Sequence, residues 1–145
     1  NTLDQKLQIN AEKFLELDDE KIPTGNFIPM ENHAFDFRSS KNVVAGIDHC
    51  FVLKNNTEPA AILESVKNGV TMKVYTDQPA VQIYVGGKTS DELQNKESVE
   101  YHTESGICFE TQVFPDAPNH EDFPNAILRK GETYQQNTTF QFIIS

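Results

Sequence analysis

The chain has 145 residues, which is enough for one domain that buries roughly two-thirds of its unfolded surface. With 22 acidic against 12 basic residues, it carries a formal net charge of −10. This charge supplies no basic stripe for nucleic acid and would be repelled by an anionic membrane, and no apolar run in the sequence is long enough to span a bilayer. We therefore expect no nucleic-acid partner, no membrane partner and a cytoplasmic location.

Alternation of apolar and polar residues predicts a series of short strands. Val70, Met72 and Val74 face one way in their segment, while Thr71 and Lys73 face the other. The same period of two predicts strands at Lys6–Asn10, Cys50–Lys54, Ala60–Ser65, Val70–Tyr75, Ala80–Val85, Ile107–Phe114 and Thr138–Ile144, with turn signals between them.

Two segments depart from this pattern. The composition of Ala11–Asp18 would allow a helix, but the segment is short and runs into an acidic run, Glu16 to Glu20, that is expected to form a solvated turn. The polar segment Asp91–Glu100 indicates a loop. Many short strands separated by turns predict an all-β, antiparallel sandwich or barrel, with no internal boundary between residues 1 and 145.

The two cysteines, Cys50 and Cys108, are too few for a disulfide framework and lack the spacing of a metal site. His49 and Cys50 are neighbours on a predicted strand, so they point to opposite faces and are poorly placed to share one ion. We therefore expect no metal and two buried free thiols.

Strand alternation also groups polar side chains that share a face. Glu110 and Gln112 lie on one side of their predicted strand, Gln82 and Tyr84 on one side of another, and Asp48 just precedes a third. Asp48, Gln82 and Glu110 would then line one pocket, with the donors and acceptors that sugar hydroxyls require and a carboxylate able to act as a general base. The alternative is that each side chain is merely solvated on the exposed face of an antiparallel sheet.

Histidines and aromatic residues elsewhere favour structural roles. His33, His102 and His120 occur in polar, loop-like segments and are expected to cap turns or lie on the surface. Phe140 and Phe142 share one side of the last predicted strand, which favours a place in the core over stacking on a sugar.

Six separated segments carry recognisable motifs. They are Ile22-Pro23-Thr24-Gly25, Phe35-Asp36-Phe37-Arg38, Gly46-Ile47-Asp48-His49, Thr76 to Tyr84, Ile107 to Gln112 continuing through Phe114 to His120, and Leu128 to Tyr134. In sequence and order they resemble the motifs of the aldose 1-epimerases, the galactose mutarotases. Each motif is weak alone, but the six follow one another in register across nearly the whole chain.

The resemblance implies a galactose mutarotase-like antiparallel β-sandwich, of which this chain would supply roughly the C-terminal half. It places the general base of the family on Glu110 and its sugar-binding Asp and Gln on Asp48 and Gln82. The implied reaction interconverts the α- and β-anomers of an aldohexose such as galactose or glucose by acid/base ring opening. The partner is then a monosaccharide substrate, and no cofactor is implied.

The sequence departs from the family in one large respect. The general acid of the family is a His in an N-H-x-Y-F-N-type motif, which is absent here, and the chain begins at Asn1 without an initiator Met. We therefore expect this chain alone to be nearly inactive and to pair with the missing N-terminal half or with another copy. Val85-Gly86-Gly87, where T-G-N is common, leaves the sugar preference open. The alternative function is a non-catalytic sugar-binding or regulatory protein that uses the same pocket.

Overall fold

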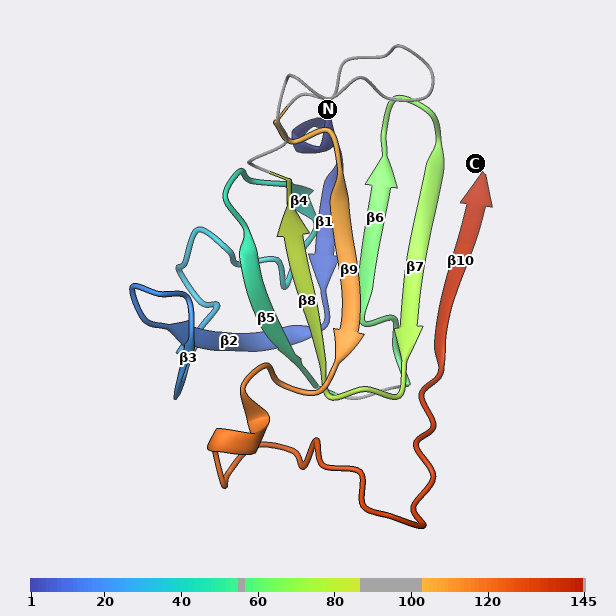
Figure 1. Ribbon diagram of the computed structural model, residues 1–145. Helices are drawn as coiled ribbons and strands as arrows, with labels where there is room; N and C mark the ends of the chain where they lie inside the picture. Colours follow the sequence, from blue (N-terminus) through green and yellow to red (C-terminus); the bar gives the residue numbers. More distant parts are fainter. Residues whose placement is uncertain (55–56, 87–102, 145) are drawn as a thin grey trace.

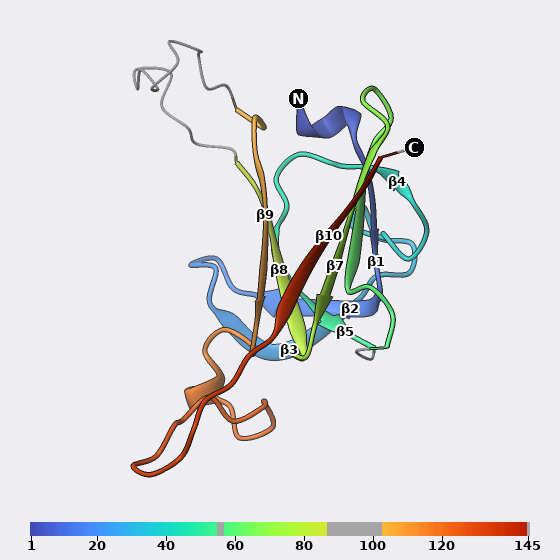
Figure 2. The same cartoon turned by 90° about the vertical axis from the view of Figure 1, so that its right-hand side faces the viewer.

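The computed structural model describes residues 1–54, 57–86 and 103–144, and in these ranges ten strands form two antiparallel sheets. The sheets pack face to face as a sandwich (Figures 1 and 2). Sheet A has the order β10 (Thr138–Ile144), β7 (Val70–Thr76), β6 (Ala61–Ser65), β1 (Lys6–Ile9), β4 (Lys41–Asn42). Sheet B has the order β3 (Pro23–Pro29), β2 (Ala11–Leu17), β5 (Asp48–Leu53), β8 (Ala80–Val85), β9 (Ile107–Gln112). The all-β sandwich expected from the sequence is confirmed.

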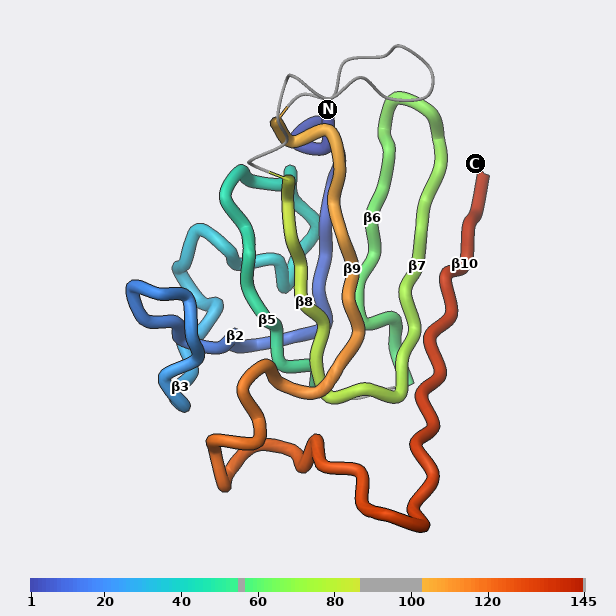
Figure 3. The backbone as a smooth tube through the Cα atoms, viewed as in Figure 1, coloured from blue at the N-terminus to red at the C-terminus, as the bar shows by residue number. Residues whose placement is uncertain are grey.

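Short helical turns and long connections complete the described ranges. Two 3₁₀ turns occur at Thr2–Asp4 and Ala117–Asn119, and no helix among the described residues is long and apolar enough to cross a membrane. Figure 3 shows the long segment that leaves β9, passes below both sheets and enters β10 at the edge of sheet A. The expected loop Asp91–Glu100 lies outside the described residues.

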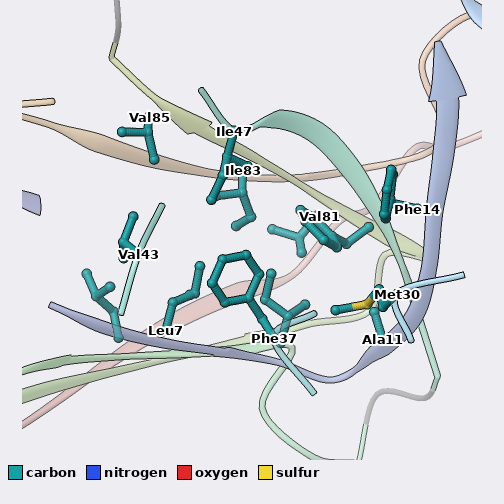
Figure 4. Packing of buried hydrophobic residues seen from close by; sticks show 13 residues of the cluster. Leu7, Ala11, Phe14, Met30, Phe37, Val43, Ile47, Val81, Ile83 and Val85 are labelled. Atoms are coloured by element: carbon teal, nitrogen blue, oxygen red, sulfur yellow. The ribbon is translucent and has the colours of Figure 1, made fainter. Parts of the chain in front are cut away.

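The core lies between the inner faces of the two sheets. Val81, Ile83 and Val85 alternate along β8 and point toward sheet A, where they are almost fully buried. Phe51 on β5 packs against Phe14, with 5.7 Å between ring centroids. Burial of each such side chain contributes roughly 1.5–3 kcal/mol. The cluster (Figure 4) comprises Leu7, Ile9, Ala11, Phe14, Met30, Phe37, Val43, Ile47, Phe51, Leu63, Val81, Ile83 and Val85.

The helix that composition would allow at Ala11–Asp18 does not form, because Ala11–Leu17 is strand β2 in sheet B. Register shifts against β5 and β3 interrupt its alternation, so Ala11, Phe14 and Leu15 are the buried positions. Irregularities of this kind insert a residue into the pleat. The resulting spacing of three and four mimics one turn of an amphipathic helix. Phe14 faces the core, whereas Leu15 packs on the outer face of sheet B.

The expectation that Phe140 and Phe142 lie in a core is also wrong for this chain. β10 forms the edge of sheet A, and every residue from Thr139 to Ile144 is exposed. The exposed fractions are 65% for Phe142 and 82% for Ile144. The strand itself forms as predicted and pairs with β7 along its whole length. The pattern therefore predicted the strand, but it does not specify what covers the faces of an edge strand.

Truncation of Phe51 tests the position of the core. We expect Phe51→Ala to lower the free energy of unfolding by about 3–5 kcal/mol, because it removes a buried ring between the sheets. Urea unfolding followed by circular dichroism measures the change. Val66→Ala is the control, because Val66 is 58% exposed in the turn after β6, and it should stay within about 0.5 kcal/mol of the wild type. Equal losses in the two variants would contradict this core.

Candidate functional site

The three residues singled out from the sequence project from the same face of sheet B, away from sheet A. The register of the sheet pairs Gln82 on β8 with Cys50 on β5 and with Glu110 on β9. Asp48 is the first residue of β5 and lies opposite Tyr84. These polar residues lie on the outer face because their neighbours in the strands, such as Ile83, point into the core.

A short chain of polar contacts connects two of these residues with a lysine. The Gln82 side-chain amide donates a hydrogen bond to Asp48 Oδ1 at 2.9 Å. The Lys21 ammonium donates to Asp48 Oδ2 at 3.1 Å. Both carboxylate oxygens of Asp48 are therefore held by donors, one from β8 and one from the turn that joins β2 to β3.

These side chains border an open depression of about 230 Å³ on the outer face of sheet B. The buried thiol of Cys50 belongs to its floor, and Glu110 is exposed at one side. Among the described residues, no hydrogen bond or ion pair occupies the Glu110 carboxylate, so it can accept a proton or a hydrogen bond from a bound molecule. The lining residues are Leu17, Lys21, Pro23, Asp48, Cys50, Gln82, Tyr84, Glu110, Gln112 and Pro115.

The wall beside β3 depends on the loop that follows β9. Phe114 and Phe123 of this loop pack on Phe27, with ring centroids 6.0 Å from it in each case. The His120 imidazole nitrogen Nε2 lies 3.2 Å from the Pro23 carbonyl oxygen and 3.2 Å from the Asp116 carboxylate. The loop thus covers part of the outer face of sheet B and fixes one edge of the depression.

Gly25 and His120 connect two of the sequence motifs. Gly25 has a φ of +91°, and a Cβ atom there would lie 3.0 Å from the His120 ring. Both observations favour glycine. Any other residue would be strained at this φ, and its Cβ atom would crowd the His120 ring, which the loop holds in place. His120 therefore has the structural role expected from its context. His33 accepts a hydrogen bond from the Phe35 backbone N–H, while His102 lies outside the described residues.

His49 supports the start of β5 from the inner side of sheet B. Its ring lies 4.8 Å from that of Phe35 and 5.3 Å from that of Phe14, between centroids. Burial lowers the pKa of His49 and so favours the neutral imidazole. The ring nitrogen Nδ1 accepts a hydrogen bond from the Asp48 backbone N–H at 3.2 Å. The main chain at Asp48 is therefore held by His49 from the inner side of sheet B.

The expectation of two buried thiols is half wrong. Cys50 is buried, and desolvation raises its pKa to about 12, but Cys108 is exposed. Cys108 lies on the outer face of β9, the edge strand of sheet B, beyond the part of the face that the 113–123 loop covers. In the described ranges, no three His, Cys, Asp or Glu side chains come together as a metal site.

A second hollow, of about 180 Å³, lies beside β1 and differs in its chemistry. Its two cations are already paired, Lys54 with Glu12 at 2.9 Å and Arg38 with Asp36 at 2.8 Å. The Arg38 guanidinium lowers the pKa of Asp36 to about 2, so this pair stays charged over the neutral range. The Asp36-Arg38 part of the second motif therefore closes a turn, outside the depression on sheet B.

Comparison with known proteins identifies the family of this chain. Residues 1–141 match the family model of aldose 1-epimerase. The chain belongs to the aldose 1-epimerase family. It is 37% identical to galactose mutarotase from Mus musculus over 155 aligned positions, which cover 100% of this chain and 45% of that protein. It is 33% identical to aldose 1-epimerase from Escherichia coli K12, covering 95% of this chain and 44% of that protein.

Solved structures of the epimerase family share this fold. The crystal structure of a GalM/aldose epimerase homologue from C. elegans superposes with a TM-score of 0.87 at 26% identity, covering 99% of this chain and 47% of that one. The chain spans about half the length of the curated epimerase relatives it matches.

Sequence reasoning missed the contribution of the turn between β2 and β3 to this epimerase-family chain. The residues Lys21 to Gly25 carry a turn signal in the sequence, but Pro23 already begins strand β3. Lys21 follows an acidic run that indicated nothing beyond a solvated turn, and its distance to Asp48 depends on the pairing of β2 with β5. No local pattern in the sequence signals that contact.

The two thiols give a direct test of the outer face. We expect a maleimide reagent to label one thiol rapidly in the folded chain, because Cys108 is exposed and Cys50 is buried with a raised pKa. Mass spectrometry before and after unfolding counts the labels, with one expected before and two after. Cys108→Ser is the control and should remove the rapid label. Rapid labelling of Cys50 in that variant would contradict the buried floor.

Proposed function

We propose that the whole protein is an aldose 1-epimerase that interconverts the α- and β-anomers of an aldohexose such as galactose or glucose. The observation that carries this proposal is the grouping of Glu110, Gln82 and Asp48 around one depression in a chain of this family. The names of the mouse and bacterial relatives support the same reaction class. The cytoplasm is the proposed location and suits a strongly acidic chain acting on a neutral sugar.

In the proposed reaction, Glu110 acts as the general base. Its carboxylate removes the proton from the C1 hydroxyl of the cyclic sugar while a general acid protonates the ring oxygen. The bond between C1 and the ring oxygen breaks, and the electron pair of the former O–H bond forms the C1 carbonyl. Rotation about C1–C2 and closure by the reverse steps give the other anomer. No electron acceptor or cofactor enters this balance.

Asp48 and Gln82 hold the sugar in the proposal. Their hydrogen bond at 2.9 Å fixes both side chains before a ligand arrives, which lowers the entropic cost of binding. The free lone pairs of Asp48 accept hydrogen bonds from sugar hydroxyls, and the Gln82 carbonyl oxygen can accept another. The general acid belongs to the family motif that this sequence lacks.

A second candidate is a sugar-binding or regulatory protein that uses the same depression without chemistry. The observation in its favour is that the Gln82–Asp48 hydrogen bond and the depression that these residues line could bind sugar hydroxyls without any proton transfer. Equal sugar binding by the wild type and Glu110→Gln, with no anomerisation by the whole protein, would support this candidate over the enzyme.

We also propose that an N-terminal half or another copy of the chain pairs with the exposed strand β10. Phe140, Phe142 and Ile144 leave an apolar surface at the edge of sheet A, a feature that proteins normally cover. The relatives are about twice as long as this chain, which is consistent with such a covering segment.

Substitution of the proposed base tests the enzyme. We expect Glu110→Gln in the whole protein to lower the rate of anomerisation by roughly a hundredfold or more, because the amide cannot accept the C1 proton. Polarimetry of freshly dissolved α-galactose or α-glucose measures the rate. Glu64→Gln provides the control, since Glu64 is exposed on strand β6 of sheet A, and should retain the wild-type rate. A wild-type rate in Glu110→Gln would exclude Glu110 as the base.

The chain of 145 residues tests the need for a further half. We expect it to show little or no anomerisation alone, because it lacks the acid motif, and to associate through β10. Light scattering coupled to gel filtration measures the association, and a Phe142→Lys and Ile144→Lys double variant should weaken it by adding charge to the apolar surface. Full mutarotation by the isolated chain would contradict the first expectation. A wild-type chain that is monomeric in light scattering would contradict the second.

A further inference from the structure

Lys21 occupies an unusual place at the border of the depression. It is the residue before Ile22 in the turn between β2 and β3, and its φ of +65° lies in the left-handed region that residues other than glycine rarely adopt. Such a conformation persists where the surrounding contacts enforce it. The position of Lys21 is therefore determined by the turn rather than by the preference of lysine itself.

Asp18 enforces this conformation. Its side-chain Oδ1 accepts the backbone N–H groups of Glu20 and Ile22, each at 2.9 Å. Its carbonyl oxygen accepts the Lys21 N–H at 3.0 Å, and its own N–H donates to the Ile22 carbonyl oxygen at 2.9 Å. Asp18 thus makes four hydrogen bonds within the turn. The turn places the Lys21 side chain at the depression, which Lys21 helps to line.

The Lys21 ammonium then acts on one oxygen of Asp48. It lies 3.1 Å from Asp48 Oδ2, while the Gln82 amide holds Oδ1 at 2.9 Å. With one donor on each oxygen, rotation of the carboxylate about its last bond would break a contact. Without Lys21, only the hydrogen bond from Gln82 would restrain the Asp48 side chain. The Asp48 carboxylate would then sample more orientations.

We propose that Lys21 is a positioning residue that fixes the Asp48 carboxylate for sugar binding, an inference that rests on the proposed function. Lys21 acts through Asp48 and makes no contact with Glu110, the proposed base. Its loss should therefore weaken binding of the sugar and leave the proton transfer largely intact. The turn between β2 and β3 then has a binding function of its own.

The expected effect is modest because the pair is partly solvated. The side chain of Lys21 is 67% exposed and that of Asp48 33% exposed, and ion pairs in such settings contribute little. We expect Lys21→Met in the whole protein to raise the KM for galactose or glucose by about two- to fivefold, with kcat lowered by less than about twofold. Met keeps the length of the side chain and removes the donor.

Two further variants separate positioning from a general structural effect. Lys21→Arg retains the donor and should restore most of the lost affinity. Lys67→Met removes an exposed lysine from the β6–β7 turn, in sheet A, and should leave both KM and kcat at wild-type values. Isothermal titration with the sugar measures its Kd independently of catalysis, and the Kd should change in parallel with KM. A fall in kcat without a change in Kd would overturn the positioning role.

The outcomes distinguish this inference from the proposed function. Suppose that the wild type binds sugar and that Glu110→Gln lowers the anomerisation rate as expected. An unchanged Kd and KM in Lys21→Met would then overturn only the role of Lys21. Sugar binding without anomerisation by the wild type would overturn the enzyme, yet a weaker Kd in Lys21→Met would still support positioning. No sugar binding by the wild type would overturn both.

Discussion

The alternation of side chains along β5, β8 and β9 couples the core to the candidate site. In β8, Val81, Ile83 and Val85 are buried against sheet A, so Gln82 and Tyr84 must face outward. A slip of one residue in the register would bury polar groups and expose apolar ones, at a cost of several kcal/mol. The packing of the sandwich therefore fixes which side chains meet at the depression.

The outer face of sheet B needs a second constraint, because part of it is apolar. Leu15 and Cys50 lie there, and the loop after β9 covers them with Phe114 and Phe123. His120 fastens this loop to β3, where Gly25 leaves room for its ring. What stays uncovered is the polar border around Asp48, Gln82 and Glu110. Several motif residues thus act on the shape of the site.

The sequence predicted most strands and the face on which the polar residues lie, because both follow from a period of two. The prediction failed at β2, where the register is irregular. Phe14 and Leu15 are buried on opposite faces there, so the buried positions are spaced as in a helix. It also failed for Cys108, whose exposure depends on the position of β9 at the edge of sheet B. Local patterns encode the direction of side chains, whereas register shifts and the cover of a face depend on the tertiary structure.

The separation of the two sheets has a consequence for function. Every residue that lines the depression belongs to sheet B or to the segments that flank its strands. The exposed apolar strand β10, in contrast, is the edge strand of sheet A. The Gln82–Asp48–Lys21 contacts form without any group from beyond this chain. In the proposed enzyme, sugar binding is therefore separable from the supply of a general acid, because the proposed sugar-binding contacts lie within this chain.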